Sequence, residues 1–123
     1  MSITQLSISG QLKAAKALIS DEKFWLNNGL YSESADNTSS LDPWDSDACK
    51  FCSIGALARV VGITTETELH ELHTASKIVG YIDKSVGSSK TAHYNDTHTH
   101  QEVMLAWDAA IAMAEQDEQE ATQ

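Results

Sequence analysis

Hydrophobic residues recur every three or four positions through several stretches of this chain, a spacing that aligns them on one face of an α-helix. The pattern predicts helices over residues 9–20, 47–61 and 65–80, and a last helix from about residue 99 to 115. A short helix over 21–29 fits the acidic residues at its start and an Asn28-Gly29 stop. The chain is therefore predicted to be mainly helical.

The stretch over 47–61 is predicted to be the central helix, because its apolar stripe is continuous. The stripe consists of Phe51, Ile54, Leu57, Ala58 and Val61. Gly55 lies within it, where glycine costs about 1 kcal/mol relative to alanine, so we expect another backbone to approach closely at that point. Gly62 is expected to end the helix.

Two capping boxes mark predicted helix starts. Thr65 with Glu68, and Thr99 with Glu102, have the spacing at which two side chains satisfy free backbone N–H groups reciprocally. The first box opens a helix that we expect to stop at Gly80 or Gly87. The second opens the last helix.

Two polar stretches separate the helices. Residues 30–46 are rich in Ser, Asp and Asn and contain Pro43, so they are predicted to form a long loop. Because it carries Trp44 and other large apolar residues, this loop is expected to fold back onto the body and be partly ordered. Residues 81–98 are left open between a continuing helix and a short extended piece followed by a loop, with Asn95 and Asp96 in an Asx turn.

Together these elements predict an all-α fold, a compact single-domain bundle of about four to five helices with a long ordered loop before the central helix. The domain is expected to span residues 1–115. Residues 116–123 are acidic and polar, and are expected to form a disordered tail. The chain has 123 residues, of which 41% are hydrophobic, which is enough for one such core.

The net charge of the chain indicates which class of partner it can bind. The formal net charge is −10, and no Lys or Arg follows Lys90. Such a surface repels phosphate backbones, so direct nucleic-acid binding is not expected, whereas a protein partner with a basic surface would be attracted. No apolar stretch has the length of a membrane span, and no signal-like segment opens the chain, so a cytoplasmic protein without membrane association is expected.

Cys49 and Cys52 form a C-x-x-C pair that could supply two zinc ligands. The histidine pairs His70/His73 or His98/His100 could complete a set of four. The gaps between these pairs match no standard zinc ribbon or finger, and the strand that precedes a redox C-x-x-C is missing. No metal and no cofactor are therefore expected.

Cys52 is also a candidate nucleophile, since the positive end of a helix dipole lowers a thiol pKa. A base and an orienting group would come from downstream residues: His93, Asn95, Asp96, His98 and His100. Against this, the sheet that carries the histidine in papain-like enzymes has no counterpart in the pattern. Burial as an inert core thiol is the default role of cysteine, and packing is our expectation here.

Several short motifs occur in a fixed order: W-L-N-N-G at 25–29, D-P at 42–43, F-C-S-I-G-A-L at 51–57, Y-N-D at 94–96 and T-x-x-E-V at 99–103. In this combination the chain, over residues 12–114, resembles an uncharacterised family of small bacterial and phage-borne domains with no assigned function. The resemblance places Cys52 inside a motif and Cys49 outside. It also places His98 at a position usually held by arginine, which implies that His98 is not catalytic.

The leading functional prediction is a small acidic protein-binding module rather than an enzyme, with a phage- or mobile-element-borne inhibitor of a host protein as its specific form. Its predicted binding residues are Trp44, Asn95, Asp96, Asp117, Glu118 and Glu120. The alternative is a cysteine-dependent hydrolase or transferase that uses Cys52 near Asn95 and Asp96.

Overall fold

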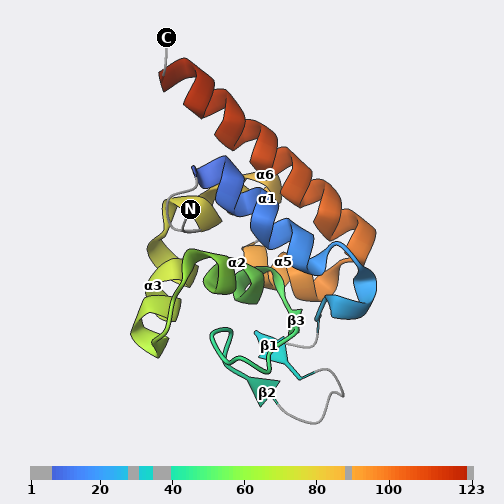
Figure 1. Ribbon diagram of the computed structural model, residues 1–123. Coiled ribbons are helices and arrows are strands. Elements are labelled where there is room, and N and C mark those ends of the chain that lie inside the picture. The colour runs from blue at the N-terminus through green and yellow to red at the C-terminus, as the bar shows by residue number, and fades with distance from the viewer. Residues whose placement is uncertain (1–6, 28–30, 35–39, 88–89, 122–123) are drawn as a thin grey trace.

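The computed structural model describes residues 7–27, 31–34, 40–87 and 90–121, and helices dominate these ranges (Figure 1). The α-helices are α1 (Ile8–Ile19), α2 (Ser53–Val61), α3 (Glu66–Ala75), α4 (Lys77–Ser85), α5 (Thr91–Thr97) and α6 (His100–Ala121). The other described elements are a 3-10 turn, η2 (Glu22–Phe24), and three short strands, β1 (Ser32–Glu33), β2 (Ser40–Leu41) and β3 (Lys50–Phe51). The prediction of a compact, predominantly all-α fold is confirmed, but the described ranges contain six α-helices where about four to five were expected.

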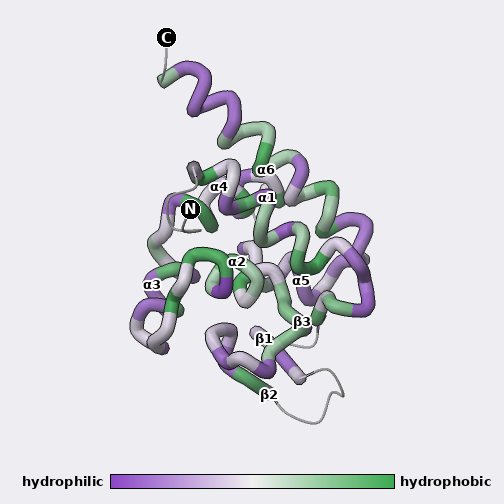
Figure 2. Tube along the Cα trace, viewed as in Figure 1, coloured by the Kyte–Doolittle hydropathy of each residue, from purple (hydrophilic) through white to green (hydrophobic). Residues whose placement is uncertain are grey.

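Helix α2 lies at the centre of the molecule. It packs against α1, α6 runs along α1, and α4 packs against α6 (Figure 1). The large side chains that are fully buried in this core include Leu12, Ile19, Ile54, Leu57 and Trp107. Figure 2 shows hydrophobic positions concentrated in α2, whereas the last turns of α6 are mostly hydrophilic.

The central helix begins at Ser53, six residues later than the pattern predicted. The backbone N–H groups before it bond elsewhere: Cys49 donates to the carbonyl of Glu33, and Cys52 donates to the carbonyl of Tyr31, at 3.1 Å each. Strand β3 also pairs antiparallel with β1, with Phe51 opposite Ser32. These sheet contacts replace the first turns of the predicted helix.

The loop before the central helix is partly ordered, as expected, but through a sheet that was not predicted. The strand order is β2-β1-β3, and both pairings are antiparallel. Arg59 of α2 fixes the following turn by donating to the carbonyls of Pro43, at 3.0 Å, and Asp45, at 2.7 Å. Strands of two residues are too short to show the alternation by which a strand is recognised in a sequence.

The helix expected over 65–80 is two helices, α3 and α4, which meet at Ser76. The Ser76 hydroxyl donates to the carbonyl of Leu72 and accepts from the N–H of Val79, so one side chain serves the end of α3 and the start of α4. Gly80 lies inside α4 and ends nothing. Gly87 follows α4 with a φ of 76°.

Residues 91–97, expected to be loop, form helix α5. Its start is held by a distant residue: Asp83 of α4 accepts hydrogen bonds from the N–H and the hydroxyl of Thr91, at 2.8 and 2.7 Å. The predicted Asx turn at Asn95 and Asp96 is therefore wrong, because both residues are helical. The predicted short helix over 21–29 is reduced to η2, and its expected stop at Asn28-Gly29 lies outside the described residues.

Both capping boxes are confirmed. Thr99 accepts from the N–H of Glu102 at 3.2 Å, and the Glu102 carboxylate accepts from the N–H of Thr99 at 3.0 Å. The bonds that the Thr99 N–H and hydroxyl donate to the Glu102 carboxylate lower its pKa. In the other box Thr65 caps the N–H of Glu68, and the Glu68 carboxylate reaches the N–H of Thr64.

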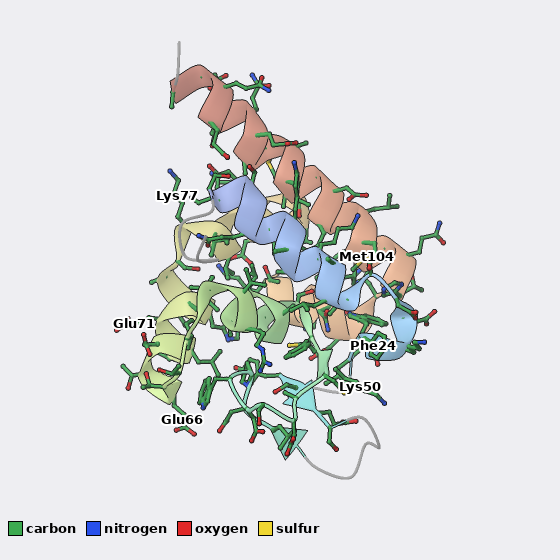
Figure 3. The ribbon with its side chains drawn as sticks, in the orientation of Figure 1. Phe24, Lys50, Glu66, Glu71, Lys77 and Met104 are labelled. Carbon is green, nitrogen blue, oxygen red and sulfur yellow. The ribbon has the colours of Figure 1, made fainter. Side chains whose placement is uncertain are left out.

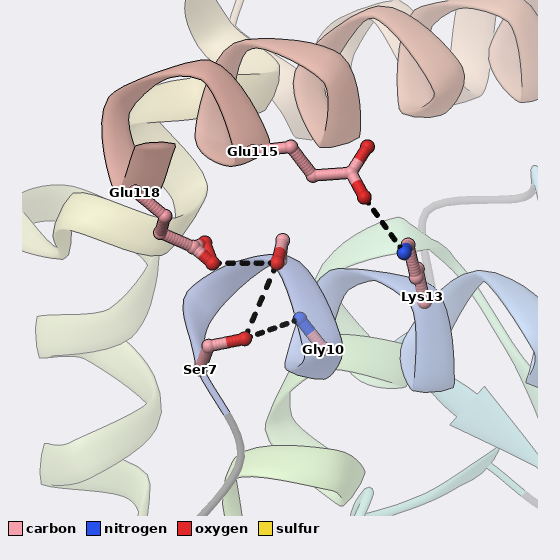
Figure 4. Close-up of polar contacts among 6 residues, drawn as sticks. Ser7, Gly10, Lys13, Glu115 and Glu118 are labelled. Atoms are coloured by element: carbon pink, nitrogen blue, oxygen red, sulfur yellow. Dashed lines mark hydrogen bonds and ion pairs between the residues drawn. The ribbon is translucent and has the colours of Figure 1, made fainter. Parts of the chain in front are cut away.

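Helix α6 runs to Ala121, through most of the stretch predicted to be a disordered tail. Its last turns contact two other helices. The Ser9 hydroxyl donates to Glu118 at 2.6 Å, Lys13 pairs with Glu115 at 2.8 Å (Figure 4), and the Tyr81 hydroxyl donates to Asp117 at 2.6 Å. An acidic run with no neighbouring cation in sequence therefore finds its partners on α1 and α4.

Candidate functional site

The sequence motifs converge on a buried polar network at the start of α2. Asn95 of α5 is 1% exposed, and its side-chain oxygen accepts from the Trp25 indole at 2.8 Å, and from the N–H and hydroxyl of Ser53 at 3.1 and 2.8 Å. Its side-chain amide donates to the carbonyl of Leu26 at 2.7 Å and to Asp96 at 3.1 Å. Asn95 thus joins α5, the start of α2 and the segment after η2.

The arrangement of donors fixes the orientation of the Asn95 side chain. The indole N–H of Trp25 and the backbone N–H of Ser53 can only donate, so the side-chain oxygen of Asn95 must face them. The Ser53 hydroxyl in turn accepts from the Trp107 indole at 3.0 Å, which extends the network into α6. Because its polar groups satisfy one another, this network has the character of a structural hub rather than of a substrate site.

Cys52 is the N-cap of α2, and its sulfur accepts from the N–H of Gly55 at 3.4 Å. The residue is 5% exposed, as expected for a packing thiol. Burial, opposed only in part by backbone hydrogen bonds, raises the thiol pKa from 9.0 to about 11. A nucleophilic thiol requires the opposite shift, because the thiolate is the reactive form.

Of the histidines proposed as bases, His98 and His100 have other partners, and His93 is exposed on α5. His98 stacks on Tyr94, with ring centroids 3.6 Å apart. His100 bonds the carbonyl of Ile19 at 2.7 Å and contacts the Trp25 ring. Among the described residues, no group of three or more His, Cys, Asp or Glu side chains could hold a metal ion.

The structure separates the predicted binding residues instead of gathering them. Trp44 is half-buried against the core, and Asn95 is buried in the network with Asp96 beside it. Asp117 and Glu118 bond Tyr81 and Ser9, and Glu120 accepts from Gln116 within α6. The bond to Asp117 and the burial of the ring raise the pKa of Tyr81. The end of α6 is therefore engaged within the molecule.

A different acidic surface, on α3, was missed by the sequence reasoning. Glu66, Glu68 and Glu71 are exposed there, and Figure 3 shows Glu66 and Glu71 extending outward from the helix. Only Leu69 and Leu72 of α3 are buried. The signal that could have revealed this surface is the absence of any Lys or Arg between residues 60 and 76.

A groove adjoins these glutamates. It lies where the turn after α2, helix α3 and the start of α4 meet, and its lining residues are Ile63, Glu68, Glu71, Leu72, Ala75 and Ser76. We call these six residues the α3 groove. Within the described part of the chain, no helix has the length and apolar character needed to cross a membrane.

Comparison with known proteins identifies a family but no activity. The model of a family of unknown function, DUF6197, matches residues 4–113. No curated protein and no solved structure gives a significant match.

Proposed function

The chain belongs to this family of unknown function, and from the geometry of its residues we propose that it is a small acidic protein-binding module. The observation that carries the proposal is the distribution of its acidic groups. Those of α6 are largely bonded to other helices, whereas Glu66 and Glu71 of α3 face solvent beside an apolar groove. Glu68, between them, is exposed but also caps its own helix. An exposed surface of one charge sign favours association with a surface of the opposite sign.

The buried network supports this reading because it gives the sequence motifs a structural role. Trp25, Ser53 and Asn95 bond one another in the interior, and Gly55 lies against the Tyr31 carbonyl. Because these motif residues stabilise the interior, we expect other residues, on the surface, to contact a partner. Inhibition of a host protein is the specific form of this activity that we expected from the sequence, and it stays a prediction.

The cysteine-enzyme alternative gains no support from the geometry. The Cys52 sulfur caps a helix, and burial, with a smaller contribution from the Asp96 carboxylate, raises its pKa to about 11. His98 and His100, the nearest histidines in sequence to Asn95 and Asp96 on the C-terminal side, bond backbone carbonyls of Tyr94 and Ile19. We therefore favour binding over catalysis.

Charge reversal on α3 tests the proposal. The first step identifies partner proteins that cross-link to the intact chain in host lysate. The second step measures the affinity of the recovered partner for the intact chain and for the Glu66→Lys/Glu71→Lys variant. The control is Glu22→Lys/Asp47→Lys, which makes the same change in charge at exposed residues outside α3. Loss of affinity in the first variant alone supports the proposal, and equal affinities of both variants would contradict it.

A further inference from the structure

The α3 groove is an open depression beside exposed glutamates. Its volume is about 420 Å³, within the range of roughly 300–1,000 Å³ typical of ligand pockets. Ile63 and Leu72 form an apolar floor, Ala75 is exposed at one wall, and the exposed glutamates Glu68 and Glu71 stand at the rim. The groove thus offers an apolar slot between carboxylates.

The cationic residues of α1 and α2 have partners of their own. Lys13 and Lys16 pair with Glu115 and Asp108 of α6, and Arg59 bonds the loop carbonyls of Pro43 and Asp45. Lys77 is the nearest cationic residue in sequence, yet Figure 3 shows it well apart from Glu71. Glu71 therefore keeps most of its attraction for cations, whereas one oxygen of Glu68 already accepts from the Thr64 N–H and the Thr65 hydroxyl.

We propose that the α3 groove binds a short basic amphipathic segment of a partner protein. An apolar side chain of that segment enters the slot above Ile63 and Leu72, and flanking Lys or Arg side chains reach Glu68 and Glu71. This assignment names the partner chemistry of the protein-binding function proposed above and rests on it.

Charge complementarity selects this occupant over two others. A second copy of the chain also carries a net charge of −10, so two copies repel one another before any apolar contact forms. Nucleic acid is repelled for the same reason. A basic segment gains both from the apolar floor and from the carboxylates, which is the combination used when amphipathic helices bind grooves.

The probe is a synthetic amphipathic peptide of about 12 residues, with leucines on one face and flanking lysines. One matched peptide replaces the leucines with serine and keeps the charge, and another replaces the lysines with glutamate and keeps the apolar face. We expect the parent peptide to bind with at least about tenfold higher affinity than either control, measured by fluorescence anisotropy. If the peptide still binds after its leucines are replaced, the α3 groove is not its binding site.

Variants of the protein locate the peptide. Ala75→Trp fills the wall of the groove without changing the charge, and is expected to weaken binding of the parent peptide by about tenfold. Glu71→Gln is expected to weaken it about two- to fivefold, as for loss of one exposed ion pair. Glu22→Gln, with the same loss of charge at an exposed residue of η2, is expected to have no effect, and circular dichroism checks that each variant is folded.

The outcomes separate this inference from the broader function. If Ala75→Trp leaves peptide affinity unchanged while charge reversal on α3 abolishes partner binding, the groove assignment fails and the protein-binding function stands. If Ala75→Trp instead dissolves a homodimer seen by sedimentation, the occupant is a second copy and the inference is overturned. If neither peptide nor partner responds to the α3 variants, both proposals fail.

Discussion

Two glycines, one in α2 and one in α4, have opposite surroundings, so substitution by alanine is predicted to have opposite effects on stability. A Cβ at Gly55 of α2 would lie 1.9 Å from the carbonyl oxygen of Tyr31, the same oxygen that accepts from the N–H of Cys52. A Cβ at Gly80 of α4 would meet nothing within 4 Å. We expect Gly80→Ala to stabilise the protein by about 0.5–1 kcal/mol, because alanine favours helix.

Gly55→Ala is expected to destabilise the protein by on the order of 2–4 kcal/mol, because backbone at the contact must move. Chemical denaturation of the two variants, measured side by side, checks both signs. A stabilised Gly55→Ala protein would show that Tyr31 does not lie against α2 in solution.

Asn95 is the residue whose loss should cost most among the polar ones. Asn95→Ala removes the acceptor of the Trp25 indole and of the Ser53 N–H, together with the donor to Leu26. Since a buried group left without its partner costs about 1–3 kcal/mol, we expect a loss on the order of 3 kcal/mol or more in the free energy of unfolding. His93→Ala, an exposed change on the same helix, is the control and should alter stability by less than about 0.5 kcal/mol.

The Cys52 thiol gives the protein a specific sensitivity to alkaline pH. Its folded-state pKa of about 11 exceeds the ordinary value of 9.0, so above pH 9 the unfolded chain loses this proton before the folded chain does. The contribution of this buried thiol to the free energy of unfolding is fully present below pH 9 and is lost as the pH rises through about 11. At about 1.4 kcal/mol for each pH unit of difference, the loss approaches 3 kcal/mol.

Comparison of unfolding free energies at pH 8 and pH 10.5 measures this effect. In Cys52→Ser, which retains a side chain able to cap α2, the drop should be smaller than in the intact protein. In parallel, a thiol reagent should label half-buried Cys49 faster than Cys52 at neutral pH. Fast labelling of Cys52 in the folded protein would instead revive the catalytic alternative.

At the scale of elements, the end of α6 behaves as part of the fold. Deletion of residues 117–123 removes the acceptors of the Tyr81 and Ser9 hydroxyls, and both donors are buried. We expect the truncated protein to lose about 1–3 kcal/mol of stability, because each hydroxyl needs a new partner. Glu120→Gln, which keeps the helix and both contacts, should melt like the intact protein. Equal melting temperatures for the truncated and intact chains would show that the tail merely solvates.

Elements were predictable where their determinants are local. The capping boxes at Thr65 and Thr99 and the apolar stripe of α2 lie in contiguous sequence, and each was found. Helix α5 depends on Asp83, eight residues before Thr91, and β3 depends on β1, so a local pattern contains neither. The boundary at Ser76 was missed because the apolar spacing continues from α3 into α4 and predicts one helix, although a serine is also a common helix cap.

For the whole molecule, the candidate site shows a similar division. The chain's acidity was evident from the sequence. Which acidic side chains are available to a partner was not, because that depends on which lysines and hydroxyls the fold brings near them. Asp117 and Glu118 looked exposed by their density, whereas Lys13, Ser9 and Tyr81 approach that end of α6 from other helices. The α3 glutamates, less dense in sequence, are the ones left facing solvent.

The buried network has a kinetic consequence. Its bonds join residues 70, 42 and 54 positions apart: Trp25 to Asn95, Ser53 to Asn95, and Trp107 to Ser53. Closing such long loops is slow relative to forming a helix, so the network should assemble after the main folding barrier has been crossed. Asn95→Ala should then accelerate unfolding far more than it slows refolding, a low φ-value that stopped-flow measurements of both rates would reveal. The residue that ties the motifs together would thus govern how long the native state lasts rather than how fast it is reached.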